Sequence, residues 1–318
     1  MDAHVLRTKA NLLKRVRQFF ESKNVLEVNT PCIVPHPVSD PNIDSIQLQT
    51  QAPAYLRTSP ESTHKWLLAH QLGDIFELGP VFRAGELGRH HEPEFLMLEW
   101  YRCGYDWRGL ADEVIELIHF MSEGYHAAWT TRFCSWEDTL EEHLGLTLQQ
   151  TKLEHLQSKL PPELSQDPRV LTWSREALLD YLYATEVQSQ FDPNTLTVVY
   201  DYPADQSALA QLNPDGLTAK RFEVFLGSIE VGNGYQELTD YQEQKRRFED
   251  DQKKRLESER PIASMDERLL EALALGLPAC SGVALGVERI IMAILQLDKV
   301  SDAMTVSAAH PFSEHTKP

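Results

Sequence analysis

The sequence predicts an α+β fold: an antiparallel β-sheet flanked by helices. Stretches with helical periodicity are interspersed with strand-like stretches along the 318 residues. Several of the strand-like stretches follow one another closely enough to pair as hairpins, which favours antiparallel neighbours. No internal repeat, low-complexity linker or break in composition marks a boundary. We therefore expect residues 1–318 to form a single domain.

The N-terminal segment predicts a helix followed by a strand. Residues 5–22 place their apolar side chains largely on one face, as an amphipathic helix does. The next stretch, 24–34 (NVLEVNTPCIV), is rich in β-formers but contains Pro31. A proline there indicates an edge strand or a strand end, often at a boundary or an interface.

A hairpin and a second helix are expected next. Residues 45–58 alternate apolar and polar side chains, which suggests an exposed hairpin. Residues 59–72 then begin a helix, with Ser59 as its cap and Pro60 in the first turn.

The middle of the chain predicts a strand pair and a long helix. Residues 76–86 and 92–102 read as two antiparallel strands joined by a polar loop. Asp106 is placed to cap a helix over 106–125, whose apolar positions recur at helical spacing.

The second half repeats this mixture. Residues 135–190 look mainly helical, and 196–203 and 221–235 look like strands. The charged run 242–260 predicts an exposed helix because opposite charges are close neighbours and apolar residues are few. The last helix is expected to begin near Gly286.

Composition excludes several functional classes. The chain has 30 Lys+Arg against 48 Asp+Glu, a net charge of −18, which repels nucleic acid, so tRNA binding is not expected. No window is apolar enough for a membrane span, and the N-terminus lacks a signal peptide. Four scattered cysteines without a Cys-x-x-Cys pair indicate reduced thiols, a cytoplasmic location and no zinc site.

Two arginines lie in settings suited to phosphate. Arg83 falls in residues 82–101 (FRAGELGRHHEPEFLMLEWY), and Arg289 falls in residues 281–294 (SGVALGVERIIMAI), one turn into a helix that follows glycines. A guanidinium holds phosphate oxygens in a fixed fork, and a helix N-terminus favours anions. The alternatives are a surface salt bridge of Arg83 with Glu86 or Glu99, and glycines that serve packing alone.

A carboxylate pair and a histidine add to this pattern. In residues 230–238 (EVGNGYQEL), Glu230 and Glu237 flank what reads as a tight glycine-rich turn, so both could face one magnesium ion or one ammonium group. The alternative is a hairpin turn with two solvated glutamates. His91 lies beside acidic residues without a third ligand, which favours hydrogen bonding to a nucleotide or to the backbone over metal binding.

Together these segments resemble the catalytic domain of class II aminoacyl-tRNA synthetases, and specifically of lysyl-tRNA synthetases. Residues 24–34 resemble the first motif of that class, with Pro31 at its proline, a segment that forms part of a homodimer interface. Residues 82–101 resemble the second motif and 282–289 the third. Residues 221–238 are similar to the lysine-specific strand.

Two features narrow the resemblance to the elongation factor P–(R)-β-lysine ligases, a family of lysyl-tRNA synthetase paralogues. The first-motif helix begins within the first few residues, so we expect no OB-fold anticodon-binding domain. The third motif has Ala284 where lysine synthetases have the middle glycine of Gly-x-Gly-x-Gly-x-x-Arg, as the paralogues do. A methyl group there reshapes the pocket by about one carbon, worth roughly 1–3 kcal/mol.

The resemblance implies ATP, Mg²⁺ and (R)-β-lysine as ligands and carries roles to matching positions. Arg83 and Arg289 would be catalytic, holding the α- and γ-phosphates, and Glu230 and Glu237 would bind magnesium. Glu61 would pair with the β-amine. The ATP-binding positions would be Arg83, Ala84, Gly85, Glu86, His91, Glu92, Glu230, Val231, Gly286 and Arg289. The substrate-binding positions would be Ser59, Pro60, Glu61, Glu99, Tyr101, Asn233, Glu237 and Ala284, with Glu237 and Tyr101 taking the ε-ammonium.

The second motif departs from the family pattern. The usual Arg-Asn-Glu reads Arg83-Ala84-Gly85 here, so Gly85 stands at the adenine-facing glutamate. Glu86, one residue later, substitutes for it if the loop shifts. Glu92 likewise stands where asparagine is common.

The expected function is that of an ATP-dependent ligase. It would activate (R)-β-lysine as an adenylate and transfer it to a lysine ε-amine of elongation factor P, without a covalent enzyme intermediate. One alternative is a ligase that uses α-lysine. Another is a catalytically inactive synthetase-like regulator, which the Ala84-Gly85 departure favours and the retained arginines and carboxylates oppose.

Overall fold

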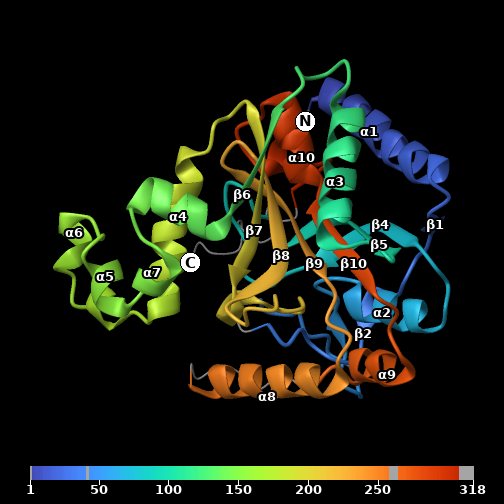
Figure 1. Ribbon diagram of the computed structural model, residues 1–318. Helices are drawn as coiled ribbons and strands as arrows, with labels where there is room; N and C mark the ends of the chain where they lie inside the picture. The colour runs from blue at the N-terminus through green and yellow to red at the C-terminus, as the bar shows by residue number, and fades with distance from the viewer. Residues whose placement is uncertain (1, 41–42, 258–263, 308–318) are drawn as a thin grey trace, which may run out of the picture.

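An eight-stranded sheet forms the centre of the protein in this computed structural model, which describes residues 2–40, 43–257 and 264–307. Its strand order is β1-β4-β5-β10-β9-β8-β7-β6, and β2 and β3 form a separate small pair (Figure 1). The strands are β1 Leu26–Glu27, β2 Ile33–Val34, β3 Tyr55–Leu56, β4 Ile75–Phe82, β5 Glu94–Cys103, β6 Thr130–Ser135, β7 Thr195–Pro203, β8 Thr218–Leu226, β9 Ile229–Gln236 and β10 Cys280–Gly286.

Helices cover both faces of this sheet. The α-helices are α1 Ala3–Ser22, α2 Glu61–Ala69, α3 Trp107–Ser122, α4 Trp136–Leu144, α5 Leu153–Gln157, α6 Pro162–Ser165, α7 Arg175–Leu182, α8 Tyr241–Glu257, α9 Glu267–Leu275 and α10 Val287–Leu295. Shorter turns of 3-10 or π type are η1 Leu148–Gln150, η2 Val170–Thr172, η3 Tyr183–Val187, η4 Gln188–Gln190, η5 Ala204–Gln206 and η6 Val300–Ala303.

The sheet is mixed rather than wholly antiparallel. From β4 through β5, β10, β9 and β8 to β7, each strand pairs antiparallel with the next, as expected. At the two edges, β1 pairs with β4 and β6 pairs with β7 in parallel. Parallel neighbours need a long crossover, and both pairs have one: α2 lies between β1 and β4, and the helical region α4 to α7 lies between β6 and β7. The sequence-based expectation was therefore too simple at the two sheet edges.

Among the described residues, three buried apolar clusters pack helices against the sheet. The largest packs α1, α3 and α10 against one face of the sheet. A second holds the helical region α4 to α7 against β7 and β8, on the left of Figure 1, and a third joins α2, α8 and α9 to the opposite part of the sheet. The second face is thus covered at both ends, and its middle is left for a cavity.

Most of the predicted elements are confirmed. The N-terminal helix is α1, the strand pair is β4 and β5, and Asp106 caps α3 by accepting a hydrogen bond from the Gly109 amide. In the predicted hairpin over 45–58, Gln47 bridges Tyr55. The charged helix is α8, although residues 258–260 of the predicted run lie outside the described part of the chain.

Two local predictions were wrong. Pro60, not Ser59, occupies the N-cap of α2, although the Ser59 hydroxyl still accepts a hydrogen bond from the Glu61 amide. The glycine-rich stretch is no turn: it lies within β9, and the chain reverses earlier, at Gly227, whose φ of +57° suits glycine. The glycines of β9 instead give room to buried neighbours, since a Cβ on Gly234 would meet Phe222 at 2.4 Å.

Candidate active site

A row of side chains crosses the second face of the sheet. Directly opposed residues on paired strands point to the same face. The register aligns Glu77 of β4, Glu99 of β5, Ala284 of β10, Asn233 of β9 and Glu223 of β8. The sheet therefore brings together residues from positions 77 to 284 along one line, beneath a cavity of about 1090 Å³.

One end of the cavity is acidic. Glu61 begins α2, and Glu237 follows β9; both line the cavity. Lys65, buried one turn after Glu61, lies between them: its Nζ is 2.6 Å from Glu61 Oε1 and 2.6 Å from Glu237 Oε2. Burial, together with the charge of nearby Glu61, raises the pKa of Glu237 to about 8 against the lowering effect of Lys65.

Glu99 forms the floor of this acidic end. It accepts hydrogen bonds from the Ser59 hydroxyl at 2.7 Å and the Tyr101 hydroxyl at 2.9 Å. The imidazole of His64 lies behind it, with Nδ1 3.4 Å from Glu99 and Nε2 3.0 Å from Glu77. Burial alone would lower the pKa of His64, but the contacts with Glu77 and Glu99 outweigh it and raise the pKa.

Gly282 makes room for this arrangement. A Cβ at this position would lie 2.3 Å from the Tyr101 ring and 2.5 Å from Glu237 Oε1. The glycine was expected to help a phosphate approach the helix, but it lies near the start of β10 and is needed here because two side chains of the acidic end occupy the space above it.

The other end of the cavity is basic. Arg83 follows β4, and its guanidinium stacks on the Phe95 ring at 5.2 Å. The guanidinium also lies 3.5 Å from Glu86, so the salt bridge considered as an alternative is present, and Arg83 still lines the cavity. Arg289 of α10 donates to the backbone oxygens of His90 and Glu230 at 3.0 Å each. Burial lowers the pKa of His91, and the positive charges of Arg289 and Arg83 lower it as well, whereas the negative charge of Glu86 opposes this shift.

The loop after Arg83 explains the departure from the family motif. Gly85 has φ +75°, a conformation that strains other residues, so this backbone does not suit a glutamate there. Glu86 lines the cavity instead. Ala84 is held by its amide, which donates to the Asp44 oxygen at 2.8 Å, and Glu92 is buried and accepts a hydrogen bond from Ser307.

A β-bulge brings a second carboxylate pair together. The register steps from Val224↔Gly232 to Phe225↔Glu230, which leaves Val231 as an extra residue whose side chain enters the main core. A bulge shifts the alternation of a strand by one residue. Glu230 therefore lies on the same face as Glu223, and burial together with the charge of Glu230 raises the pKa of Glu223, while Arg221 at 2.5 Å opposes this.

The predicted pairing of Glu230 with Glu237 does not fit this geometry. Seven residues of extended strand separate them by roughly 20 Å. Glu237 is moreover paired with Lys65 at the acidic end. Within the described residues no group of three or more metal-binding side chains occurs. Glu223 and Glu230 are the carboxylates that fit a magnesium ion whose remaining ligands come from phosphate and water.

The remaining predicted residues also line or support the cavity. Ala284 lies between Glu99 and Asn233 in the row. Asn233 accepts from Arg221 at 3.2 Å and donates to the Tyr235 hydroxyl at 2.8 Å. Gly286 is the N-cap of α10, and Pro60 is buried at the start of α2.

Sequence reasoning missed three groups: Lys65, His64 and Glu223. Lys65 follows Glu61 by four residues, so its pairing with Glu61 was visible as helical spacing. Its pairing with Glu237 and the contacts of His64 depend on how α2 packs against the sheet, and the position of Glu223 depends on strand register. The local sequence carries no signal for either.

Comparison with known proteins shows the family to which the chain belongs. A model of the family "tRNA synthetases class II (D, K and N)" matches residues 2–308. The chain belongs to this family. It is also 39% identical over 318 aligned positions to proteins named elongation factor P–(R)-β-lysine ligase from Salmonella paratyphi B, Salmonella heidelberg and Salmonella agona. Each alignment covers 94% of this chain and 96% of the relative.

The helices can also be compared with the requirements of a membrane span. Among the helices of the described ranges, none joins sufficient length to the apolar character that a bilayer span requires.

Proposed function

We propose that this chain is an ATP-dependent ligase that activates (R)-β-lysine as an adenylate and attaches it to a lysine ε-amine of elongation factor P. The observation that carries the proposal is the division of one cavity into an acidic and a basic end. Among the described residues, the acidic end holds Glu61, Glu99 and Glu237 against one buried ammonium, that of Lys65. This surplus of negative charge suits a substrate with two ammonium groups.

The basic end suits the nucleotide. Arg83 and Arg289 neutralise phosphate charge, and His91, whose pKa is lowered by burial and by both arginines, stays neutral and adds no charge. The bound amino acid would extend its carboxylate from the acidic end toward Arg83. A carboxylate oxygen then attacks the α-phosphorus, the bond to the β-phosphate oxygen breaks, and pyrophosphate leaves. Fixed positive charge stabilises the transferring group, as in other phosphoryl transfers.

Magnesium would be held by Glu223 and Glu230, beside Arg289. When bound, it would add positive charge to the phosphates. The protein positions this pair rigidly, since Glu223 also accepts hydrogen bonds from Arg221 and, at 2.7 Å, from Tyr202.

Transfer completes the reaction. The acceptor ε-amine, in its neutral form, attacks the acyl carbon of the adenylate, AMP leaves, and the amine proton is lost. A protein acceptor, rather than tRNA, agrees with the name of the relatives and with the net charge of −18, which repels a polyanion. A cytoplasmic location, where elongation factor P and ATP meet, follows from this proposal.

ATP–pyrophosphate exchange tests the activation step. We expect exchange with (R)-β-lysine to exceed exchange with α-lysine in kcat/KM, and mass spectrometry of elongation factor P to show one added β-lysyl group. A preference for α-lysine would support the alternative ligase. Absence of exchange with either amino acid would support the inactive regulator.

A further inference from the structure

Lys65 has an unusual position for a lysine. It is 1% exposed, on α2, and its ammonium contacts carboxylates from two separate elements. Burial lowers its pKa, but the charges of Glu237 and Glu61 outweigh burial and raise the pKa above the ordinary value. The ammonium therefore stays charged and lies between Glu61 and Glu237.

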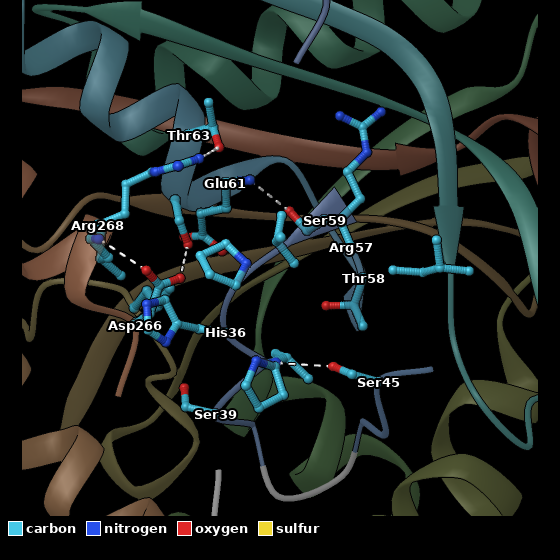
Figure 2. Close-up of a pocket in the computed structure, with 18 of the residues that line it drawn as sticks. His36, Ser39, Ser45, Arg57, Thr58, Ser59, Glu61, Thr63, Asp266 and Arg268 are labelled. Carbon is cyan, nitrogen blue, oxygen red and sulfur yellow. Dashed lines mark hydrogen bonds between the residues drawn. The ribbon is translucent and has the colours of Figure 1, made fainter. Parts of the chain in front are cut away.

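The helix that carries Lys65 is fixed from behind. Ser62 donates to Asp266, and Arg268 donates to Thr63 at 3.0 Å, so α2 is tied to the start of α9 (Figure 2). Figure 2 also shows Glu61 on the same turn, beside Ser59, where its amide is hydrogen-bonded to the Ser59 hydroxyl. Glu61 and Lys65 thus belong to one anchored turn.

The backbone that carries the other carboxylate is also anchored. The Glu237 amide donates to the Cys280 backbone oxygen at 3.0 Å, and the Gln211 side chain donates to the Glu237 backbone oxygen at 3.0 Å. Its carboxylate is 1% exposed, and apart from the ion pair with Lys65 neither oxygen has a hydrogen-bond partner within the described residues. Oε1, which lies next to Gly282 and Tyr101, can therefore accept a hydrogen bond from a substrate amine.

We propose that Lys65 is a specificity-determining positioning residue, whose ammonium holds Glu61 and Glu237 at the separation that matches the two amino groups of the substrate. The inference rests on the proposed function, in which each carboxylate binds one substrate amine. One oxygen of each carboxylate is used by Lys65, which leaves the other for a substrate amine. A diamino acid with a shorter chain then satisfies only one carboxylate and leaves the other buried without its partner.

Lys65→Met tests this, because methionine has similar length and no charge. Without the link, nothing holds Glu61 and Glu237 at their separation, and the spacing is lost. We expect the KM for lysine-length substrates to rise about 100-fold with a smaller change in kcat, and the KM for ATP to stay within about twofold. The preference in kcat/KM for lysine over ornithine, one methylene shorter, should fall at least about tenfold.

A second variant and a matched control separate positioning from folding. Lys65→Gln also removes the charge but keeps a hydrogen-bond donor, and we expect the same loss of preference. Lys253→Met, which changes an exposed lysine on α8, should behave as wild type. Thermal shift by ATP shows which variants are folded.

Several results would overturn the inference. A folded Lys65 variant that keeps the wild-type preference for lysine over ornithine would do so, and so would loss of ATP binding in both variants, which would assign Lys65 to fold stability. Calorimetric binding of the two diamino acids distinguishes this inference from the proposed function. If the Lys65 variants lose the preference for lysine over ornithine in binding while the wild-type enzyme never modifies elongation factor P, the inference is supported and the proposed function is refuted. Wild-type protein that binds neither diamino acid would defeat both.

Discussion

Single side chains set the polarity of the cavity. Glu61, Glu99 and Glu237 attract cations at one end, and Arg83 and Arg289 attract anions at the other. His64 supports the acidic end from behind, where Glu77 contacts it and Arg57; burial opposes ionisation of Glu77, but these contacts hold its pKa at about 2. Because each group has a distinct charge role, single substitutions should have separable effects.

Loss of either arginine should prevent activation. Arg83→Ala and Arg289→Ala each remove positive charge near the transferring or leaving phosphates, a loss of about 3–4 kcal/mol or more in transition-state stabilisation. We expect adenylate formation to fall below detection in pyrophosphate exchange, with an unchanged circular dichroism spectrum. Normal exchange in either variant would refute the phosphate role.

Ala284 should influence which lysine isomer is used. Its methyl group lies in the row between Glu99 and Asn233, so Ala284→Gly opens space of about one carbon. We expect activation of α-lysine relative to β-lysine to rise by up to roughly a hundredfold.

Glu61→Gln is the control for this substitution. It should weaken both isomers equally, since a neutral amide replaces a charge partner. An unchanged ratio in Ala284→Gly would contradict the pocket argument and leave the β-lysine assignment to the family relationship.

The pKa of Glu237 predicts a pH effect on stability. Burial raises it from the ordinary value of 4.5 to about 8. Between these pH values the folded protein holds a proton that the unfolded chain has released, so the free energy of unfolding should fall as pH rises through this window. Its stabilising contribution is complete below about pH 4.5 and lost above about pH 8.

Urea unfolding at fixed protein concentration measures this effect. Between pH 5 and 8.5, the free energy of unfolding of the wild type should fall by roughly a few kcal/mol more than that of Glu237→Gln. A diammonium substrate should reverse the trend, since its binding favours the charged carboxylate. Parallel pH profiles for the two proteins would show that Glu237 is ionised throughout.

At the scale of elements, strand register and one bulge assemble the site. Residues of β4, β5, β8, β9 and β10 meet in one row because the sheet is continuous, and the bulge at Val231 turns Glu230 onto that face. Gly282 in β10 then admits Tyr101 and Glu237. Small changes of backbone or Cβ in these strands should therefore affect the site more than the fold.

Gly282→Ala should damage amino acid binding specifically. Its new Cβ would displace Tyr101 or Glu237, so we expect the KM for the amino acid to rise at least about tenfold while the KM for ATP changes little. Gly88→Ala is a suitable control, because a Cβ at Gly88 meets nothing within 4 Å. Equal effects of Gly282→Ala on both KM values would indicate general disruption instead.

At the scale of the whole molecule, we propose a homodimer of catalytic units that each span residues 1–318. The segment expected at the interface is exposed here: Leu26 is 51% and Ile33 is 58% accessible. Leu26 belongs to the edge strand β1 and Ile33 to the short strand β2, and two exposed apolar side chains in this segment suit a two-fold contact.

Ile33→Glu should shift the protein toward the monomer. A charge at this position would be buried against its symmetry copy. Sedimentation equilibrium at micromolar concentration measures the association, and Leu256→Glu, at an equally exposed leucine on α8, should leave it unchanged. A fully active wild-type monomer would contradict the proposed assembly.

The sequence by itself determined the locally encoded features. Periodicity located α1 and α3, the charge pattern located α8, Asp106 marked a cap, and the arginine motifs indicated the class II family. These predictions succeeded because each depends on residues within a few turns or one strand of each other.

Only the tertiary structure decided which distant carboxylates act together. From sequence, Glu230 seemed to pair with Glu237 across a turn; in the fold, Glu230 lies beside Glu223, and Glu237 is bound by Lys65. The physical reason is that a strand alternates its side chains with period two, so one extra residue at Val231 reverses which face Glu230 occupies. That bulge is set by pairing with β8, and by packing of Val231 into the core, neither of which is written in the local sequence.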